Sequence, residues 1–293
     1  MRKSPDIRRV GLIANAEKSA AAAVLRKAAA LITRSGRAVV ADTASAALAG
    51  LKVPTCADSL ALARQTDTVL VFGGDGTMLR VARELGGVRT PILGINIGGL
   101  GFLTAVSSDE IAGALRKIWA GDFTLETRPL LEAKAAIGNR RVAHVAFNDV
   151  VISRGTLPRL VQLEVSVDGE VLTHYRCDGL IVSSPTGSTA YSLAAGGAIV
   201  SPQAEVFALT PICPHTLSNR SVIVNLSSTV CVKVLSEKLD TILAADGHTL
   251  SALSAGDTVT IRRSRRTVRL VRLAGASFFQ TLRHKLHWSG SHV

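Results

Sequence analysis

The sequence predicts an N-terminal Rossmann-like parallel α/β domain and a C-terminal, mostly antiparallel β domain, with a last helix that returns to the first domain. Over roughly the first 120 residues, short β-branched runs alternate with longer helical runs, which is typical of a parallel sheet covered on both faces. From Phe123 the pattern changes to period-two segments separated by turn residues, which is typical of antiparallel strands. The predicted limits are 1–122 with 278–293 for the first domain, and 123–277 for the second.

Predicted strands and helices alternate along the first domain. The strands are predicted at 7–14, 37–41, 68–72 and 91–95, and the helices at 18–35, 59–65, 78–85 and 109–120. The strand at 68–72 is wholly apolar, as expected of a strand with both faces buried. Ser107 or Ser108 is the predicted N-cap of the last of these helices.

The second domain contains predicted strands at 127–137, 142–153, 160–167, 171–176, 180–184, 221–224, 229–235, 241–245, 258–263 and 267–273, before a helix at 278–286. Asp168 and Gly169 form a strong hairpin signal. The last two strands are expected to form a hairpin with arginines at 262, 263, 265, 266, 269 and 272. The usual interpretation is a solvated sheet surface. A subunit contact or attraction of anionic nucleotides is the alternative.

Composition excludes several classes of protein. A chain of 293 residues that is 47% apolar favours two domains with real cores and excludes intrinsic disorder. No run approaches the roughly 20 uncharged residues that cross a bilayer, and the early apolar segment at 11–14 is too short for a signal peptide, so we expect a cytoplasmic protein. The formal charge of +12 fits an anionic substrate, whereas only 4% of residues are aromatic and no basic tail is present. The four cysteines form no C-x-x-C pair and are predicted to be reduced structural thiols.

The sharpest local motif is the segment Gly73-Gly74-Asp75-Gly76-Thr77, between an apolar strand and a helix. Glycines permit a sharp turn and the close approach of a ligand, and N–H groups at a helix start suit phosphate. Asp75 would repel a bare phosphate, so its predicted role is to receive a proton from an attacking hydroxyl or to organise a metal ion. A turn in which Asp75 only caps the helix is the alternative. The predicted phosphate loop consists of Gly73, Gly74, Gly76 and Thr77.

Two further segments are candidates for binding. Asn148 and Asp149 offer adjacent amide and carboxylate groups that suit the vicinal hydroxyls of a ribose, although an edge turn explains them equally well. The segment 178–197 runs from a strand into a loop of small hydroxyl residues and glycines, which is hard to explain by packing and leaves room for a flat ligand beside Tyr191. Neither a P-loop nor a complete Rossmann fingerprint is present, so a nucleotide site must be built differently.

Taken in order, these motifs resemble those of the bacterial NAD kinases (ATP-NAD kinases). The resemblance covers nearly the whole chain, and the six motifs together are specific, whereas GGDGT alone is also similar to segments of diacylglycerol kinases and phosphofructokinase-like enzymes. The motifs are GGDGT, LGINIGGLGFLT at 93–104, the Asn-acid pair at 148–149, DGLIVSSPTGSTAYSLAAGG at 178–197, PICPHTLSNR at 211–220 and DGH at 246–248.

The resemblance implies transfer of the γ-phosphoryl group of ATP to the 2′-hydroxyl of the adenosine ribose of NAD, giving NADP and ADP. It makes Asp75 the catalytic proton acceptor and places Gly76 against NAD. Asn148 and Asp149 would hold the ribose hydroxyls, although many relatives have a longer Glu as the second residue. The remaining residues implied in NAD binding are Arg159, Arg176, Asp178, Thr189, Ala190, Tyr191, Ser192, Leu193, Ala194 and His248. In relatives, arginine at the place of Arg176 accompanies a preference for NAD over NADH.

The resemblance also implies that ATP is the phosphoryl donor and that a divalent ion such as Mg²⁺ takes part, and it leaves the protein ligands of this ion unassigned. It further implies a homodimer or homotetramer in which a neighbouring subunit partly completes each pocket. Nucleic acid and membrane are not expected partners. We expect Asp75→Asn to lower turnover by about 10²–10⁴-fold with little change in NAD binding or Tm.

Two alternative functions make other predictions. A diacylglycerol-type lipid kinase would need an apolar groove, and a basic nucleic-acid-binding protein would show salt-sensitive affinity and no reaction with NAD.

Overall fold

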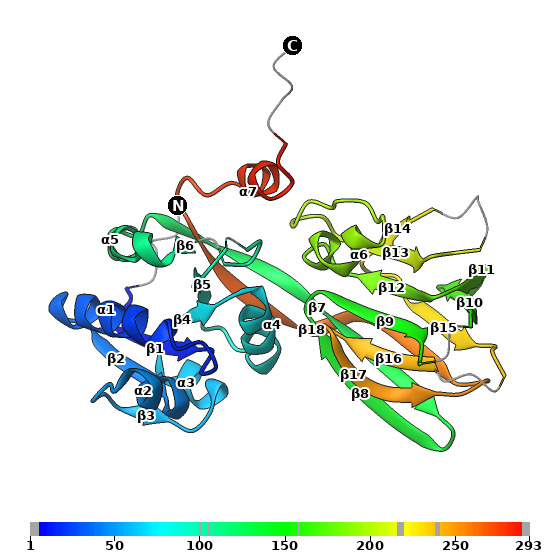
Figure 1. Cartoon of the computed structure of the whole chain (residues 1–293), viewed down its shortest axis with the longest axis horizontal. Helices are drawn as coiled ribbons and strands as arrows, with labels where there is room; N and C mark the ends of the chain where they lie inside the picture. Colours follow the sequence, from blue (N-terminus) through cyan, green and yellow to red (C-terminus); the bar gives the residue numbers. More distant parts are fainter. Residues whose placement is uncertain are drawn as a thin grey trace, which may run out of the picture. The chain divides into compact units, whose positions relative to one another are not determined.

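The computed structural model describes residues 6–99, 101–104, 106–156, 159–215, 220–237 and 241–288. It divides the chain into two compact units, of which unit 1 is Met1–Arg128 with Thr267–Val293 and unit 2 is Pro129–Arg266. The predicted fold class is confirmed, because unit 1 is an α/β unit with a parallel sheet and unit 2 is built of antiparallel strands (Figure 1). The limits of the units fall inside two long strands, β7 (Phe123–Ile137) and β18 (Thr258–Leu273).

Unit 1 contains a parallel sheet in the order β18-β5-β4-β1-β2-β3. Its other strands are β1 (Arg9–Ala14), β2 (Ala38–Asp42), β3 (Thr55–Cys56), β4 (Thr68–Gly73) and β5 (Ile92–Asn96), and β6 (Val106–Ser107) pairs with β5. The helices are α1 (Ala21–Arg34), α2 (Thr43–Ala49), α3 (Ser59–Gln65), α4 (Asp75–Glu84), α5 (Ile111–Ala120) after a short turn η1 (Ser108–Glu110), and α7 (Phe278–Lys285).

Strand β4 is buried along its whole length because helices cover both faces of the sheet. Leu70 and Phe72 point into a core that they share with α1, α2 and α5. The intervening residues face the other way, towards α3 and α4, where Gly11 lies against Leu62 and Gly94 against Met78. This alternation is what a wholly apolar strand predicts, and it places the carboxyl end of β4 at the start of α4.

Among the described helices of unit 1, α2 is the one that was not predicted from the sequence. Asp42 caps its start by accepting a hydrogen bond from the Ser45 N–H at 2.6 Å, and Gly50 ends it in a left-handed conformation with φ of 61°. Both capping signals are visible in the sequence. The helix was missed because seven residues, all small except Leu48, carry too little apolar periodicity. The predicted capping of α5 is present, since Ser107 and Glu110 form a capping box.

Unit 2 is a sandwich of antiparallel sheets around a single core. One sheet has the order β14-β13-β12-β9-β16-β17, and the other contains β11, β10, β15, β18, β7 and β8. The strands are β8 (Arg140–Ala146), β9 (Asp149–Arg154), β10 (Val161–Val167), β11 (Glu170–Cys177), β12 (Gly179–Ser183), β13 (Val206–Ile212), β14 (Val222–Asn225), β15 (Val230–Val234), β16 (Thr241–Ala245) and β17 (His248–Leu253). The helical turns η2 (Gly187–Thr189) and α6 (Tyr191–Ala194) follow β12.

Two predicted features of unit 2 are wrong, and two strands were missed. The predicted strand at 142–153 is two strands, β8 and β9, separated at Phe147 and Asn148. The arginine hairpin at 258–273 is instead the continuous strand β18, in which Arg262 pairs with Glu132 and Arg263 with Glu205. Strands β13 and β17 were not predicted. The hairpin at Asp168 and Gly169 is present, with φ of 52° and 90°.

The described part of the chain contains no helix that is both long enough and apolar enough to cross a membrane. All four cysteines are free thiols, and Cys56 and Cys177 are buried. Helix α7 belongs to unit 1, as the returning helix was predicted to do, and the Ser277 hydroxyl caps its start by accepting from the Gln280 N–H.

Candidate active site

The glycine-rich turn of unit 1 connects the end of β4 to the start of α4. Gly73 is the last residue of β4, Gly74 is the N-cap of α4 and Asp75 is the first helical residue. The N–H groups of Thr77 and Met78 both donate to the Gly74 carbonyl, at 3.0 and 3.2 Å, which closes the first turn. The predicted strand-turn-helix arrangement of the phosphate loop is therefore present.

The three glycines of this turn are explained in different ways. A Cβ on Gly73 would lie 2.3 Å from the Thr77 hydroxyl, so packing alone excludes a side chain there. Cβ atoms on Gly74 or Gly76 would meet no protein atom within 4 Å, and φ at Gly74 is −105°, which any residue adopts. Neither packing nor backbone strain requires glycine at 74 or 76. Bare backbone at these positions suits the close approach of a ligand.

The carboxylate of Asp75 is anchored by the segment 102–104. Its Oδ2 accepts a hydrogen bond from the Phe102 N–H at 2.8 Å. Its Oδ1 accepts from the N–H groups of Leu103 and Thr104 at 3.1 and 3.2 Å, and from the Thr104 hydroxyl at 3.2 Å. A Cβ on Gly101 would lie 1.9 Å from Oδ1, so the segment can approach only because residue 101 is glycine. The segment belongs to one of the motifs noted in the sequence, but its contact with Asp75 was not predicted.

In unit 2, Asp246 organises the segment that carries Asn148 and Asp149. The Asp246 carboxylate accepts from three consecutive backbone N–H groups, those of Phe147, Asn148 and Asp149, at distances between 2.7 and 3.2 Å. In return, the Asp246 N–H donates to the Asp149 carbonyl at 3.1 Å. A carboxylate that gathers three amides holds the chain in a turn, which explains why β8 and β9 are separate strands. Asp246 belongs to the DGH motif, but this role was not predicted from the sequence.

Asp149 lies in an unusual electrostatic environment. It is 4% exposed, and no described N–H or hydroxyl donates to its carboxylate. Burial raises the pKa of Asp149 to about 7, and the nearby charge of Asp246 adds to the increase. Elsewhere in unit 2, Asn148 Oδ1 and Thr186 Oγ1 are buried with no hydrogen-bond partner. Among the described residues of unit 2, these are polar groups that a ligand could satisfy.

The loop after β12 packs onto the turn at Asn148. The Asn148 carbonyl accepts from the Ser184 N–H at 2.8 Å, and a Cβ on Gly187 would lie 2.2 Å from that carbonyl oxygen. Thr189 and Ala190 are half-buried, and Tyr191 is 47% exposed. Ser192 is fully buried and its hydroxyl shares a hydrogen bond with Thr210 at 3.0 Å, so that side chain is used internally. Leu193 is half-buried and Ala194 is exposed.

The predicted binding residues of unit 2 are placed at opposite ends of β9. At one end, Asp149 pairs in register with Ser183, and Asp246 precedes the exposed His248 at the start of β17. At the other end, Asp178 accepts from Arg154 Nε at 2.9 Å. Arg154 is five positions after Asp149, which is roughly 17 Å along an extended strand. Arg154 was not predicted from the sequence.

Two further predicted binding residues, Arg176 and Arg159, do not lie beside Asp149. Arg176 is exposed two residues before Asp178, and its carbonyl accepts from the His215 N–H at 2.9 Å. Arg159 is exposed in the connection before β10. The structure therefore does not bring all predicted NAD-binding residues of one chain into a single cluster. Within the motif at 211–220, residues 216–219 lie outside the described part.

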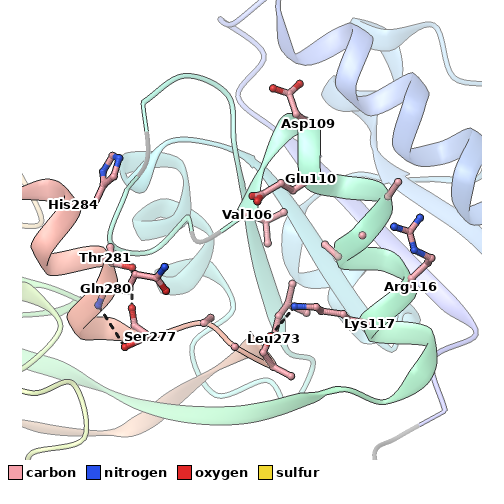
Figure 2. A pocket seen from close by; sticks show the side chains of 16 residues that line it. Val106, Asp109, Glu110, Arg116, Lys117, Leu273, Ser277, Gln280, Thr281 and His284 are labelled. Carbon is pink, nitrogen blue, oxygen red and sulfur yellow. Dashed lines mark hydrogen bonds between the residues drawn. The ribbon is translucent and has the colours of Figure 1, made fainter.

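A separate cavity of about 700 Å³ lies in unit 1, between α5 and the segment that leads from β18 into α7 (Figure 2). Lys117 borders it and donates from Nζ to the Ala274 carbonyl at 2.7 Å, while Asp109, Glu110 and His284 supply further polar groups. None of the predicted site residues lines this cavity. In the described ranges, no three His, Cys, Asp or Glu side chains form a cluster that could hold a metal ion.

An α/β unit with a glycine turn at 73–77, joined to a β unit, is the arrangement expected of the kinase class that the sequence resembles. Family models of this class match the chain: the ATP-NAD kinase N-terminal domain over residues 10–123 and the ATP-NAD kinase C-terminal domain over residues 147–273. Proteins named NAD kinase from Paraburkholderia phytofirmans and Geobacter metallireducens are 38% and 44% identical to it. The first alignment covers 99% of this chain and 96% of the relative, and the second 76% and 79%.

Solved structures agree with these sequence matches. Yeast NADH kinase, crystallised with NADH, superposes with a TM-score of 0.86 at 25% identity, over 98% of this chain and 89% of the yeast chain. An NAD kinase from Archaeoglobus fulgidus in complex with ATP has the same fold, with a TM-score of 0.75 at 24% identity over 96% of this chain and all of that chain. This chain belongs to the NAD kinase family.

Proposed function

We propose that this chain transfers the γ-phosphoryl group of ATP to the 2′-hydroxyl of the adenosine ribose of NAD, giving NADP and ADP. The observation that carries the proposal is the anchored carboxylate of Asp75, in a turn whose backbone at Gly74 and Gly76 is open to a ligand. Membership of the NAD kinase family supports the choice of substrates. ATP and NAD are cytoplasmic metabolites, and we propose that the enzyme works in that compartment.

In this reaction Asp75 orients the ribose hydroxyl and accepts its proton. A carboxylate is too weak a base to remove that proton before attack, so proton transfer accompanies formation of the new P–O bond. Phosphoryl transfer passes through a loose transition state, and the protein contributes mainly position and electrostatic stabilisation. The backbone N–H groups of Asp75 and Gly76, in the first turn of α4, would supply part of that stabilisation.

We propose Mg²⁺ as the divalent ion. When bound, it would supply positive charge that stabilises the negative charge of the transferred phosphoryl group. The residues fit an ion held chiefly by ATP and water, because Asp75 already accepts four hydrogen bonds and no acidic cluster is present among the described residues.

The strand-end cluster of unit 2 is the proposed ribose site. Asp149 and Asn148 Oδ1 are buried acceptors without donors, and vicinal hydroxyls would supply donors to both. Thr189, Ala190, Tyr191 and His248 are proposed to contact the rest of NAD from the same end of β9. Ser192 would hold the loop after β12 in place through its hydrogen bond to Thr210. Leu193 and Ala194 are proposed to complete the NAD-binding part of this loop.

Arg176 and Asp178 lie at the far end of β9, together with the salt bridge to Arg154. Because these residues are too far along the strand to join Asp149, we propose a homo-oligomer, dimer or tetramer, in which this end contributes to the NAD pocket of a neighbouring subunit. Arg159, which precedes β10, is assigned to the same contribution. Arg176 would bias the pocket towards NAD over NADH.

The direct test is incubation of the purified protein with magnesium, ATP and NAD, followed by an NADP-specific dehydrogenase readout. Parallel reactions contain NADH in place of NAD and inorganic polyphosphate in place of ATP. NADP formation that depends on all three components supports the proposal. Binding of a lipid or nucleic acid with no NADP formed would overturn it in favour of another activity.

A further inference from the structure

Asn96 and Thr104 form a buried polar pair directly behind Asp75. Asn96 is the last residue of β5, and it pairs in register with Gly73 at the end of β4. The exposed fractions of Asn96 and Thr104 are 3% and 0%. Asn96 Nδ2 lies 2.8 Å from the Thr104 hydroxyl, which in turn lies 3.2 Å from Asp75 Oδ1. The three side chains therefore form a continuous chain of hydrogen bonds.

The direction of each hydrogen bond in this chain is fixed by the chemistry of the groups. Asn96 Nδ2 also lies 2.6 Å from the Gly99 carbonyl, an acceptor, so the amide must present its nitrogen on this side. One amide hydrogen then goes to Gly99 and the other to Thr104. The Thr104 oxygen accepts from Asn96, so its single hydrogen is directed to Asp75 Oδ1.

The two oxygens of Asp75 are consequently not equivalent. Oδ1 accepts three hydrogen bonds, from the Thr104 hydroxyl and from the N–H groups of Leu103 and Thr104. Oδ2 accepts one, from the Phe102 N–H. A carboxylate oxygen offers about two lone-pair directions, so Oδ1 is saturated and Oδ2 retains an open position.

We propose that Asn96 and Thr104 are positioning residues that hold Oδ1 of Asp75 as an anchor and leave Oδ2 as the oxygen that receives the ribose proton. This inference rests on the proposed function, because it assigns a task to each oxygen of the proposed proton acceptor. Asn96 and Thr104 do not touch the substrate in this scheme. They act by fixing the direction of the open lone pair on Oδ2.

Stability alone does not account for this pair. Asn96 Oδ1 is buried with no hydrogen-bond partner, and a buried acceptor without a donor is a cost that an apolar residue at 96 would avoid. The amide nitrogen, by contrast, makes two short hydrogen bonds. The structure thus retains a destabilising group on the side of the amide that faces away from Asp75.

The test compares Thr104→Val with Thr104→Ser in the full-length protein. Valine keeps the shape and removes the hydroxyl, whereas serine keeps the donor. Thr68→Val is the matched control, because Thr68 is also 0% exposed and its hydroxyl makes one hydrogen bond, to the Pro91 carbonyl at 3.1 Å, at the opposite end of β4. The measurements are kcat, the KM values for ATP and NAD, the dissociation constant of NAD without ATP, and Tm.

We expect Thr104→Val to lower kcat by about 10- to 100-fold, the effect of losing a hydrogen bond to a charged group at the transition state. Both KM values and the NAD dissociation constant should stay within about threefold of wild type, since no contact with substrate is lost. Thr104→Ser should recover kcat to within a few fold. Thr68→Val should keep the wild-type kcat while lowering Tm about as much as Thr104→Val does.

A double-mutant cycle separates this inference from the proposed function. With Asp75→Asn as background, Thr104→Val should cause little further loss, because both changes remove the same oriented oxygen. If Asp75→Asn is inactive but Thr104→Val keeps the kcat of Thr68→Val, the positioning role is overturned and the function stands. If wild type forms no NADP, the proposed function itself fails. Should valine at 104 not fold, Thr104→Ala replaces it under the same criteria.

Discussion

Asp149→Asn should make the ligand-free protein more stable at neutral and alkaline pH, and the gain should depend on pH. The pKa of Asp149 is raised from 3.8 to about 7, first by burial and then by the charge of Asp246. Between these two values the folded state binds more protons than the unfolded state, so unfolding free energy falls as pH rises. The stabilising protonation is complete below about pH 4 and is lost as pH passes through 7. Asparagine does not titrate and escapes this loss.

The size of the effect follows from the shift. A difference of about three pKa units at about 1.4 kcal/mol each gives at most about 4 kcal/mol, reached above pH 7. Relative to wild type, the unfolding free energy of Asp149→Asn should therefore increase by up to about 1.4 kcal/mol per pH unit between pH 4 and 7, and then level off.

Urea unfolding of both proteins from pH 4.5 to 8.5, without nucleotide, measures this difference. Glu170→Gln is the control, because it makes the same change from acid to amide on an exposed side chain of unit 2. Its difference from wild type should stay within about 0.5 kcal/mol at every pH. A difference between Asp149→Asn and wild type that does not vary with pH would refute the reasoning, since it would mean that Asp149 has the same affinity for protons in both states.

Three further results are expected. Gly76→Ala should keep or slightly raise Tm, because alanine favours the helix and its Cβ would meet no protein atom within 4 Å. The same Cβ should raise the KM for NAD by at least about tenfold if the dinucleotide lies there, and an unchanged KM would remove Gly76 from the site. Asp75→Asn should lower kcat by about 10²–10⁴-fold, as the sequence predicts. Contrary to the expectation of an unchanged Tm, it should also lower the unfolding free energy by about 1–3 kcal/mol, because the new amide would face the Phe102 N–H; NADP formation and thermal unfolding test the two effects. Binding of NAD at pH 7 should release up to about half a proton from Asp149, which is about half protonated there, since hydroxyl donors favour its charged form. Titration calorimetry in buffers of different ionisation enthalpy should show no such release for Asp149→Asn.

Local patterns predicted the fold well where neighbouring residues determine it. The apolar strand at 68–72, for example, became β4 with helices on both faces. The break between β8 and β9 could not be predicted in this way, because it depends on Asp246, which lies about a hundred residues away. The local pattern at 142–153 does favour a single strand. A distant carboxylate that captures three backbone N–H groups overrides it.

The candidate site shows the same division. Sequence alone predicted the glycine turn, Asp75 and the pair at 148–149 as candidates, because residue types that conflict with packing occur there in short segments. It missed the anchoring of Asp75 by 102–104 and the salt bridge between Arg154 and Asp178. Backbone N–H groups are present at every residue except proline and carry no signature in the sequence, so their use as donors becomes visible only in three dimensions.

The two acidic sites use their surroundings in opposite ways, and the difference indicates what each can bind. Asp75 has its donors supplied by the protein, and it begins helix α4, whose first-turn N–H groups favour an anion. Asp149 has none, and it lies near Asp246 and the lone acceptor Asn148 Oδ1, which together repel a phosphate. This cluster needs a ligand that donates hydrogen bonds and carries no negative charge. Adjacent hydroxyls on the edge of a sugar meet both requirements. Burying Asp149 without donors therefore costs stability in the free protein, and hydroxyl donors of a bound ligand would offset this cost.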